Sequence, residues 1–128
     1  MSETKPPRTL LPDGRVMPRF AGICTFCRFP RLQEVLPAQR PLDWIVYGVP
    51  FDGGVTYRPG ARFGPRAVRE QSQYMKPFNL ELDVNLAQRL SLADGGDAPV
   101  SAYSCRETVE SVLAFARGLG GSSAEDAV

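Results

Sequence analysis

Residues 43–69 read DWIVYGVPFDGGVTYRPGARFGPRAVR, which has the pattern of a buried strand, a glycine-rich loop and a helix. Its first part, residues 43–49, is a nearly continuous apolar run rich in β-branched and aromatic side chains. Such a run is typical of a strand that is buried on both faces, as in a parallel sheet. Pro50 lacks the backbone N–H that a central strand needs, so we expect the strand to end there.

A glycine-rich loop follows this strand and leads into a helix. We expect Gly60 and Gly64 to adopt positive φ in the loop, where a β-branched residue would be strained. Pro65 suits the first position of a helix, because that position needs no N–H donor. The helix is predicted to run from Pro65 to about Tyr74, and Pro77 stops it.

The second half of the chain repeats the strand–helix order. Residues 77–88 are expected to form a loop. Residues 90–94 then alternate between apolar and polar side chains, which predicts a second strand, and residues 95–97 are expected to turn after it.

A second helix is predicted over 105–117. Ser104 and Glu107 have the spacing of a capping box at its start, and the apolar residues that follow fall on one face. Glycines between 118 and 121 are expected to end the helix, and the small, polar residues 122–128 are expected to form a frayed tail.

This order of elements predicts an α/β fold with a parallel sheet and right-handed crossovers. Two strands leave such a sheet incomplete, so we expect residues 42–121 to be the first part of a truncated domain. Residues 1–41 hold seven of the twelve prolines, which predicts an extended N-terminal arm with a short helical turn around 32–36. The apolar side chains of the arm need a surface to cover, either on their own domain or on a neighbouring subunit.

The composition bounds the class of protein. An apolar content of 43% and a charged content of 23% are those of an ordinary soluble domain, and a net charge of +1 gives no footprint for nucleic acid. No stretch approaches the roughly 20 apolar residues that a membrane helix needs. The polar, proline-rich N-terminus does not have the pattern of a secretory signal, so a cytoplasmic setting is expected.

The chain contains no histidine, which removes the commonest general base and the commonest metal ligand. Its three cysteines are Cys24, Cys27 and Cys105. The C-x-x-C spacing of the first two can bind zinc or serve redox chemistry, but the pair lies in irregular chain rather than at a helix start. We favour two small residues packed in a loop.

Three further groups of residues have a functional and a structural interpretation. The loop 52–65 could bind phosphate, but it matches neither common phosphate-binding motif, and Pro65 removes an N–H that an anion would use. Asp94 and Asp97 could contact a metal, or cap a turn, and we favour the cap. Four arginines could bind nucleic acid, or pair with carboxylates within or between subunits, and we favour pairing. These are Arg58, Arg62, Arg66 and Arg69.

Several of these segments together resemble the agmatinase-type ureohydrolases of the arginase family. The similarity extends from about residue 18 to residue 117, and the run from Arg58 to Arg69 is its most specific part. The matching segments are PRFAGI (18–23), TF (25–26), RFP (28–30), GVPFDGG (48–54), YRPGARFGPRAVR (57–69) and DGGDAPV (94–100).

The resemblance implies a three-layer α/β/α sandwich that assembles as a trimer or hexamer. It also implies hydrolysis of a linear guanidino compound to urea and an amine, by water bridged between two manganese ions, which would belong to polyamine metabolism. A metal-bound hydroxide is a potent nucleophile at neutral pH, so this chemistry is physically sensible. Agmatine and guanidinobutyrate fit the resemblance better than arginine does.

The metal-ligand elements of that family lie in later segments, and none is present among these 128 residues. The missing elements are Gly-Gly-Asp-His, Asp-Ala-His-x-Asp and Ser-x-Asp-x-Asp. No catalytic or metal residue is therefore assigned in this chain, and we expect a fragment that is inactive alone. The alternative is a non-catalytic interaction module that uses the arm and the loop to bind a full-length relative.

Overall fold

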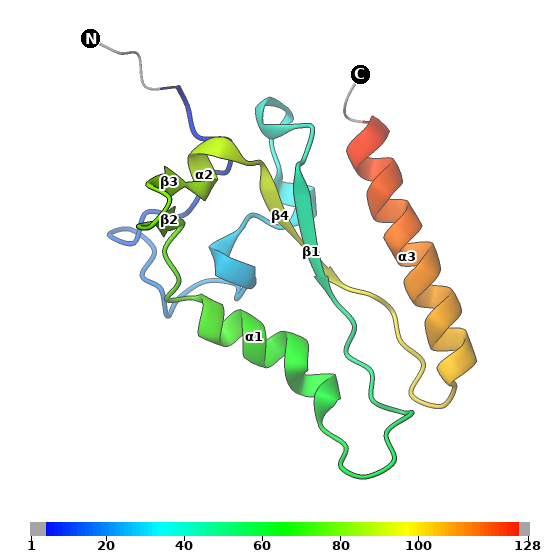
Figure 1. The fold of residues 1–128 in the computed structure, drawn as a ribbon. Helices are drawn as coiled ribbons and strands as arrows, with labels where there is room; N and C mark the ends of the chain where they lie inside the picture. Colours follow the sequence, from blue (N-terminus) through cyan, green and yellow to red (C-terminus); the bar gives the residue numbers. More distant parts are fainter. Residues whose placement is uncertain (1–4, 126–128) are drawn as a thin grey trace.

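A parallel pair of strands forms the centre of the fold in the computed structural model, which describes residues 5–125 and the side chains up to residue 120. Strand β1 (Trp44–Gly48) lies beside β4 (Leu92–Asp97), with Trp44 opposite Leu92 and Val46 opposite Asp94 (Figure 1). The predicted parallel sheet is confirmed.

Two helices cover opposite faces of this sheet. Helix α1 (Gly64–Ser72) packs on the face that carries Gly48, where an added Cβ would lie 2.7 Å from Pro65 Cβ. Helix α3 (Cys105–Glu125) packs on the other face, where the rings of Tyr47 and Phe115 lie 5.4 Å apart. The order α1, sheet, α3 is that of a partial α/β/α sandwich (Figure 1).

Strand β1 is less buried than its sequence predicts. Trp44 is 66% exposed, and the other four residues of the strand are half-buried. The reason is geometric, because among residues 5–125 only β4 pairs with β1 and the opposite edge of β1 carries no strand.

Strand β4 continues through residues that were expected to form a turn. It reaches Asp97 because Gly95 and Gly96 form a bulge, where the register against β1 shifts and Gly96 adopts φ 78°. Gly95 also allows close packing, since an added Cβ would lie 2.9 Å from Ile45 Cγ2. Gly95 and Gly96 therefore allow β4 to continue through the bulge, and no turn forms at residues 95–97.

Helix α3 begins at the predicted residue, where Ser104 Oγ accepts a hydrogen bond from the Glu107 N–H. It continues past Gly118 to Glu125, so the predicted end at 117 is wrong, because a glycine inside a helix costs only about 1 kcal/mol. Residues 122–125 of the expected tail are helical, and 126–128 lie outside the described residues. Within 5–125 no helix has both the length and the apolar character needed to cross a bilayer.

The segment predicted as a loop over 77–88 contains short regular elements. Strands β2 (Phe78–Asn79) and β3 (Val84–Asn85) pair antiparallel, and α2 (Leu86–Arg89) follows. The Asn85 side chain caps α2 by accepting from the Ala87 N–H at 3.0 Å. Elements of two to four residues are too short to produce a recognisable periodicity.

The N-terminal arm packs on its own domain. It forms three single-turn 3-10 helices, η1 (Phe26–Arg28), η2 (Leu32–Glu34) and η3 (Pro37–Gln39), and η2 lies in the predicted turn. Thr9 is buried, and its N–H donates to the Ala87 carbonyl at 2.9 Å. A bridge between Arg31 and Asp94 places the arm along the outer edge of β4.

Candidate functional site

The end of β4 carries the most closely connected charged group in the described chain. Arg69 of α1 forms two hydrogen bonds to Asp94, from Nε to Oδ2 at 2.9 Å and from Nη2 to Oδ1 at 3.1 Å. Its Nη1 lies 2.7 Å from Asp97 Oδ1. The side chains of Arg69 and Asp94 are only 14% and 3% exposed. This bidentate geometry joins α1 to β4 and suits arginine rather than lysine.

Backbone donors complete the surroundings of Asp94. Its Oδ2 accepts from the Phe26 N–H and its Oδ1 from the Gly96 N–H, each at 2.8 Å. Burial opposes ionisation, but Arg69 and these two donors hold the pKa of Asp94 below its ordinary value. The expected cap of a turn is wrong, because Gly96 lies inside β4 and Asp97 pairs with Arg69. The two carboxylates and Arg69 instead form an ion cluster, in which neither carboxylate is free.

A second carboxylate organises the glycine-rich loop. The buried Asp52 accepts from the Gly60 N–H at 2.7 Å and from the Arg62 N–H at 3.2 Å, and the Arg62 guanidinium lies 2.7 Å from its Oδ1. These bonds, above all those from the Arg62 side chain, lower the pKa of Asp52 from 3.8 to about 2. The backbone donors that a phosphate would use thus bind an anion of the chain itself.

The glycines of this loop differ from each other. Gly60 adopts φ 141°, which confirms the expected positive φ. Gly64 has φ −57° and belongs to the first turn of α1, so the expectation of positive φ there is wrong. Helix α1 begins at Gly64, one residue before Pro65, so Gly64 must already adopt helical torsion angles.

The four arginines have different environments. Arg62 and Arg69 pair with carboxylates within the chain, as favoured from the sequence. Arg58 stacks on the neighbouring Tyr57 ring at 5.1 Å, and Arg66 is exposed. Two of the four are thus held by internal ion pairs and do not contribute to a solvated basic stripe.

The cysteines lack the environment of a redox pair. Desolvation raises the pKa of the half-buried Cys27 thiol and, together with the Glu70 carboxylate, that of the exposed Cys24 thiol, whereas a reactive thiolate needs a lowered pKa. Cys27 instead connects the arm to α1, because its N–H donates to Ser72 Oγ at 2.8 Å. Cys105 is exposed at the start of α3. Within the described part of the chain, no three His, Cys, Asp or Glu residues are grouped to hold a metal ion.

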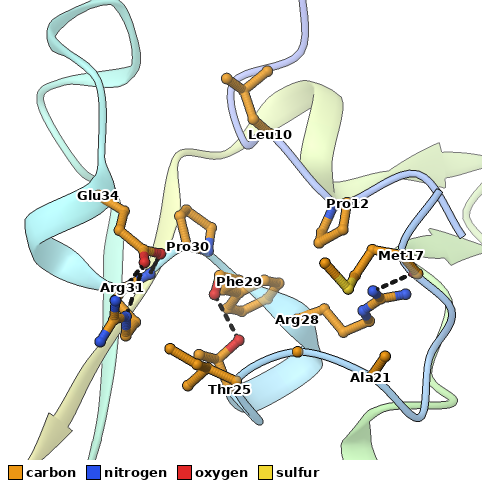
Figure 2. Close-up of a pocket in the computed structure, with 12 residues that line it drawn as sticks. Leu10, Pro12, Met17, Ala21, Thr25, Arg28, Phe29, Pro30, Arg31 and Glu34 are labelled. Atoms are coloured by element: carbon orange, nitrogen blue, oxygen red, sulfur yellow. Dashed lines mark hydrogen bonds and ion pairs between the residues drawn. The ribbon is translucent and has the colours of Figure 1, made fainter.

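The arm also encloses a cavity of about 310 Å³ (Figure 2). Leu10, Pro12 and Met17 form part of its apolar lining. Its polar groups are paired with each other, since Arg31 contacts Glu34 at 2.7 Å and Arg28 donates to the Met17 carbonyl. The cavity therefore has an apolar wall, and the polar groups at its rim already have hydrogen-bond partners within the chain.

Comparison with known proteins agrees with this fold and these motifs. Residues 42–122 match the arginase family, and the chain belongs to this family. It is 34% identical over 107 residues to proclavaminate amidinohydrolase of Streptomyces clavuligerus, a match that covers 84% of this chain and 33% of that protein. It is 39% identical over 97 residues to guanidinobutyrase of Pseudomonas aeruginosa, covering 75% and 30% respectively.

The similarity extends to three dimensions. The structure of the Streptomyces proclavaminate amidinohydrolase superposes with a TM-score of 0.70 at 33% identity, over 80% of this chain and 33% of that chain. This confirms the ureohydrolase-like α/β fold predicted from the motifs. The chain spans about a third of the length of the relatives that it matches.

Proposed function

We propose that this chain forms the N-terminal scaffold of a hydrolase that cleaves a linear guanidino compound to urea and an amine. The observation that carries the proposal is the parallel β1–β4 pair, covered by α1 and α3, in a segment that matches the arginase family. Relatives named guanidinobutyrase and agmatinase support the substrate class, with guanidinobutyrate and agmatine as the first candidates.

The two manganese ions that the family resemblance implies do not fit the residues of this chain. Asp94 and Asp97 face Arg69, Asp52 faces Arg62, and the sequence has no histidine. A metal at any of these three carboxylates would have to displace a guanidinium. The proposed role of these residues is to hold the loop and α1 against the ends of the strands, and the chain alone is proposed to be inactive.

The proposal also covers the subunit number and the cellular location of the intact enzyme. A homo-oligomer of three or six subunits and a cytoplasmic location follow from the family resemblance and the composition. The apolar side chains of the arm that the domain leaves exposed, among them Phe20 and Ile23, support a subunit contact in this region.

A chimera tests the scaffold role. The segment of Pseudomonas guanidinobutyrase that matches this chain is replaced by residues 18–121, and urea release from guanidinobutyrate and agmatine is measured. The scaffold proposal expects manganese-dependent activity with the substrate preference of the parent enzyme, since the ligand elements are unchanged. A folded, manganese-loaded chimera without activity would contradict it.

An interaction module that uses the arm and the loop is the second candidate, because Phe20 of the arm and Tyr57 of the loop expose apolar surface. Such a module would bind intact guanidinobutyrase and change its activity or subunit number when the two are mixed. A scaffold segment would leave an already complete enzyme unaffected.

A further inference from the structure

Two sulfur atoms lie close together where the N-terminal arm meets the end of α1. The Sγ of Cys27, in η1, lies 4.0 Å from the Sδ of Met75, which follows α1 in the sequence. Cys27 is half-buried and Met75 is 61% exposed, so the pair can be reached from solvent. A thiol and a thioether, both polarisable groups, are therefore presented together at one accessible point.

Ser72 fixes the backbone of both residues of this sulfur pair. Its Oγ accepts from the Cys27 N–H at 2.8 Å, and its carbonyl accepts from the Met75 N–H at 3.1 Å. Ser72 is itself buried, and its hydroxyl donates to the Arg69 carbonyl at 2.7 Å. One buried residue thus holds both sulfur-bearing segments, so a ligand that joins the two sulfurs has little chain to order.

The separation of the two sulfurs suits a single metal ion between them. Two metal–sulfur bonds of about 2.3 Å each can span up to about 4.6 Å. At a separation of 4.0 Å, one ion can bond to Cys27 Sγ and Met75 Sδ at the same time. Thiolate and thioether are soft ligands, and this pairing selects Cu(I) among the ions of the first transition row.

The surroundings of the pair favour a soft, monovalent ion over zinc or a hard cation. A structural zinc ion needs four ligands, and in the part of the chain that the structure describes no three His, Cys, Asp or Glu residues are grouped around a metal position. Desolvation raises the pKa of Cys27, the Ser72 hydroxyl opposes this, and no described carboxylate contributes. A monovalent ion on one thiolate gives a neutral complex, which suits a half-buried position.

Cys24 lies in a different part of the surface, despite the C-x-x-C spacing. It lines a cavity of about 330 Å³ together with Asp94 and Asp97, whereas Cys27 does not line this cavity and contacts Met75. The Glu70 carboxylate adds to the desolvation that raises the pKa of Cys24, and it does not act on Cys27. The two thiols therefore have different neighbours.

We propose that Cys27 and Met75 bind one Cu(I) ion, which ties the N-terminal arm to the end of α1. The ion arrives as Cu(I). The Cys27 S–H bond breaks, an S–Cu bond forms and one proton goes to solvent, while Met75 donates a sulfur lone pair. Neither the sulfurs nor the copper changes oxidation state. The site does not depend on the proposed hydrolase function.

Anaerobic titration of the 128-residue chain tests the site. Cu(I) is supplied as its complex with a chromophoric chelator, and the loss of colour measures its transfer to the protein. We expect one ion per chain. X-ray absorption at the copper edge should show sulfur ligands, because the chain has no histidine and the two proposed ligands are a thiolate and a thioether.

Two pairs of variants separate this site from the other sulfur atoms of the chain. Cys27→Ser should weaken Cu(I) binding by more than about 100-fold, beyond the usual cost of losing a partner outside the ligand shell, whereas Cys24→Ser should leave it unchanged. Met75→Leu should weaken binding by about tenfold or more, whereas Met17→Leu, at another partly exposed methionine, should have no effect. Met75→Cys should restore tight binding, since a second thiolate replaces the thioether.

Failure of the chain to take Cu(I) from the chelator overturns the proposal. Loss of binding in Cys24→Ser also overturns it, because the ion would then lie on the C-x-x-C pair, and so does binding that Met75→Leu leaves unchanged. Met75 is mostly exposed, so Met75→Leu should keep the circular dichroism spectrum of the parent chain. Weaker binding in a variant with an unchanged spectrum reports the loss of a ligand rather than a loss of fold.

Discussion

Arg69 and Asp94 join α1 to β4 through two side-by-side hydrogen bonds, of 2.9 Å and 3.1 Å, in a site that is almost closed to solvent. Arg69→Met leaves the Asp94 carboxylate buried without its cation. In the guanidinobutyrase chimera, this change should lower the free energy of unfolding by about 3–5 kcal/mol. Arg66→Met is the control, since Arg66 is exposed on the same helix and its loss should cost less than about 0.5 kcal/mol. Equal losses in denaturant titrations would contradict this account of the pair.

The stability that Asp52 gives to the glycine-rich loop should depend on pH. Its folded pKa, about 2, lies below its ordinary value of 3.8, so the unfolded chain takes up the proton first. The stabilisation by Asp52 is therefore complete above about pH 4 and is lost as the pH falls toward 2. The difference in unfolding free energy between the chimera and its Asp52→Asn variant should shrink across this window. A difference that is constant from pH 6 to about pH 2 would show that the carboxylate charge does not hold the loop.

Gly60 and Gly64 offer a direct comparison of backbone conformation. Neither position has an atom within 4 Å of an added Cβ, so substitution tests the torsion angles alone. Gly60→Ala should cost about 1–3 kcal/mol because φ is 141°, whereas Gly64→Ala should cost nothing in a helical position. Thermal unfolding of the two variants of the chimera measures this difference. Equal unfolding temperatures would contradict it.

The same loop shows what sequence reasoning could and could not reach. The strand at 44–48, the helix that contains Pro65 and the arginine–carboxylate pairing follow from local patterns, and the structure confirms them. The partner of each arginine was not predictable, because Arg69 lies 25 residues from Asp94 and only the parallel register brings them together. An aspartate four residues after the end of the strand, followed by glycines and Arg62, was the available signal for the Asp52 cluster.

The predicted ends of β4 and α3 are wrong for the same physical reason. Gly95 and Gly118 were interpreted as chain breakers, but the first lies in a bulge against Ile45 and the second inside α3. A glycine permits a turn without requiring one, and contacts with residues distant in sequence decide the outcome. The burial expected for β1 likewise depends on neighbours that residues 5–125 do not supply.

The isolated chain should be weakly stable. The open edge of β1 and exposed apolar residues such as Trp44 and Val68 leave much apolar surface in water. We expect a broad thermal transition by circular dichroism, together with strong binding of a dye that reports exposed apolar surface. A sharp, cooperative transition of a monomer with little dye binding would show that the chain is a complete folding unit.

Urea release by the purified 128-residue chain shows whether these residues can catalyse hydrolysis on their own. Guanidinobutyrate, agmatine and arginine are each supplied with manganese and, separately, with a chelator, and intact guanidinobutyrase serves as the positive control. We expect no urea above the protein-free blank in any condition, because Asp52 and Asp94 are bound to Arg62 and Arg69 and the chain has no histidine. Manganese-dependent urea release that rises in proportion to the concentration of the chain would contradict it.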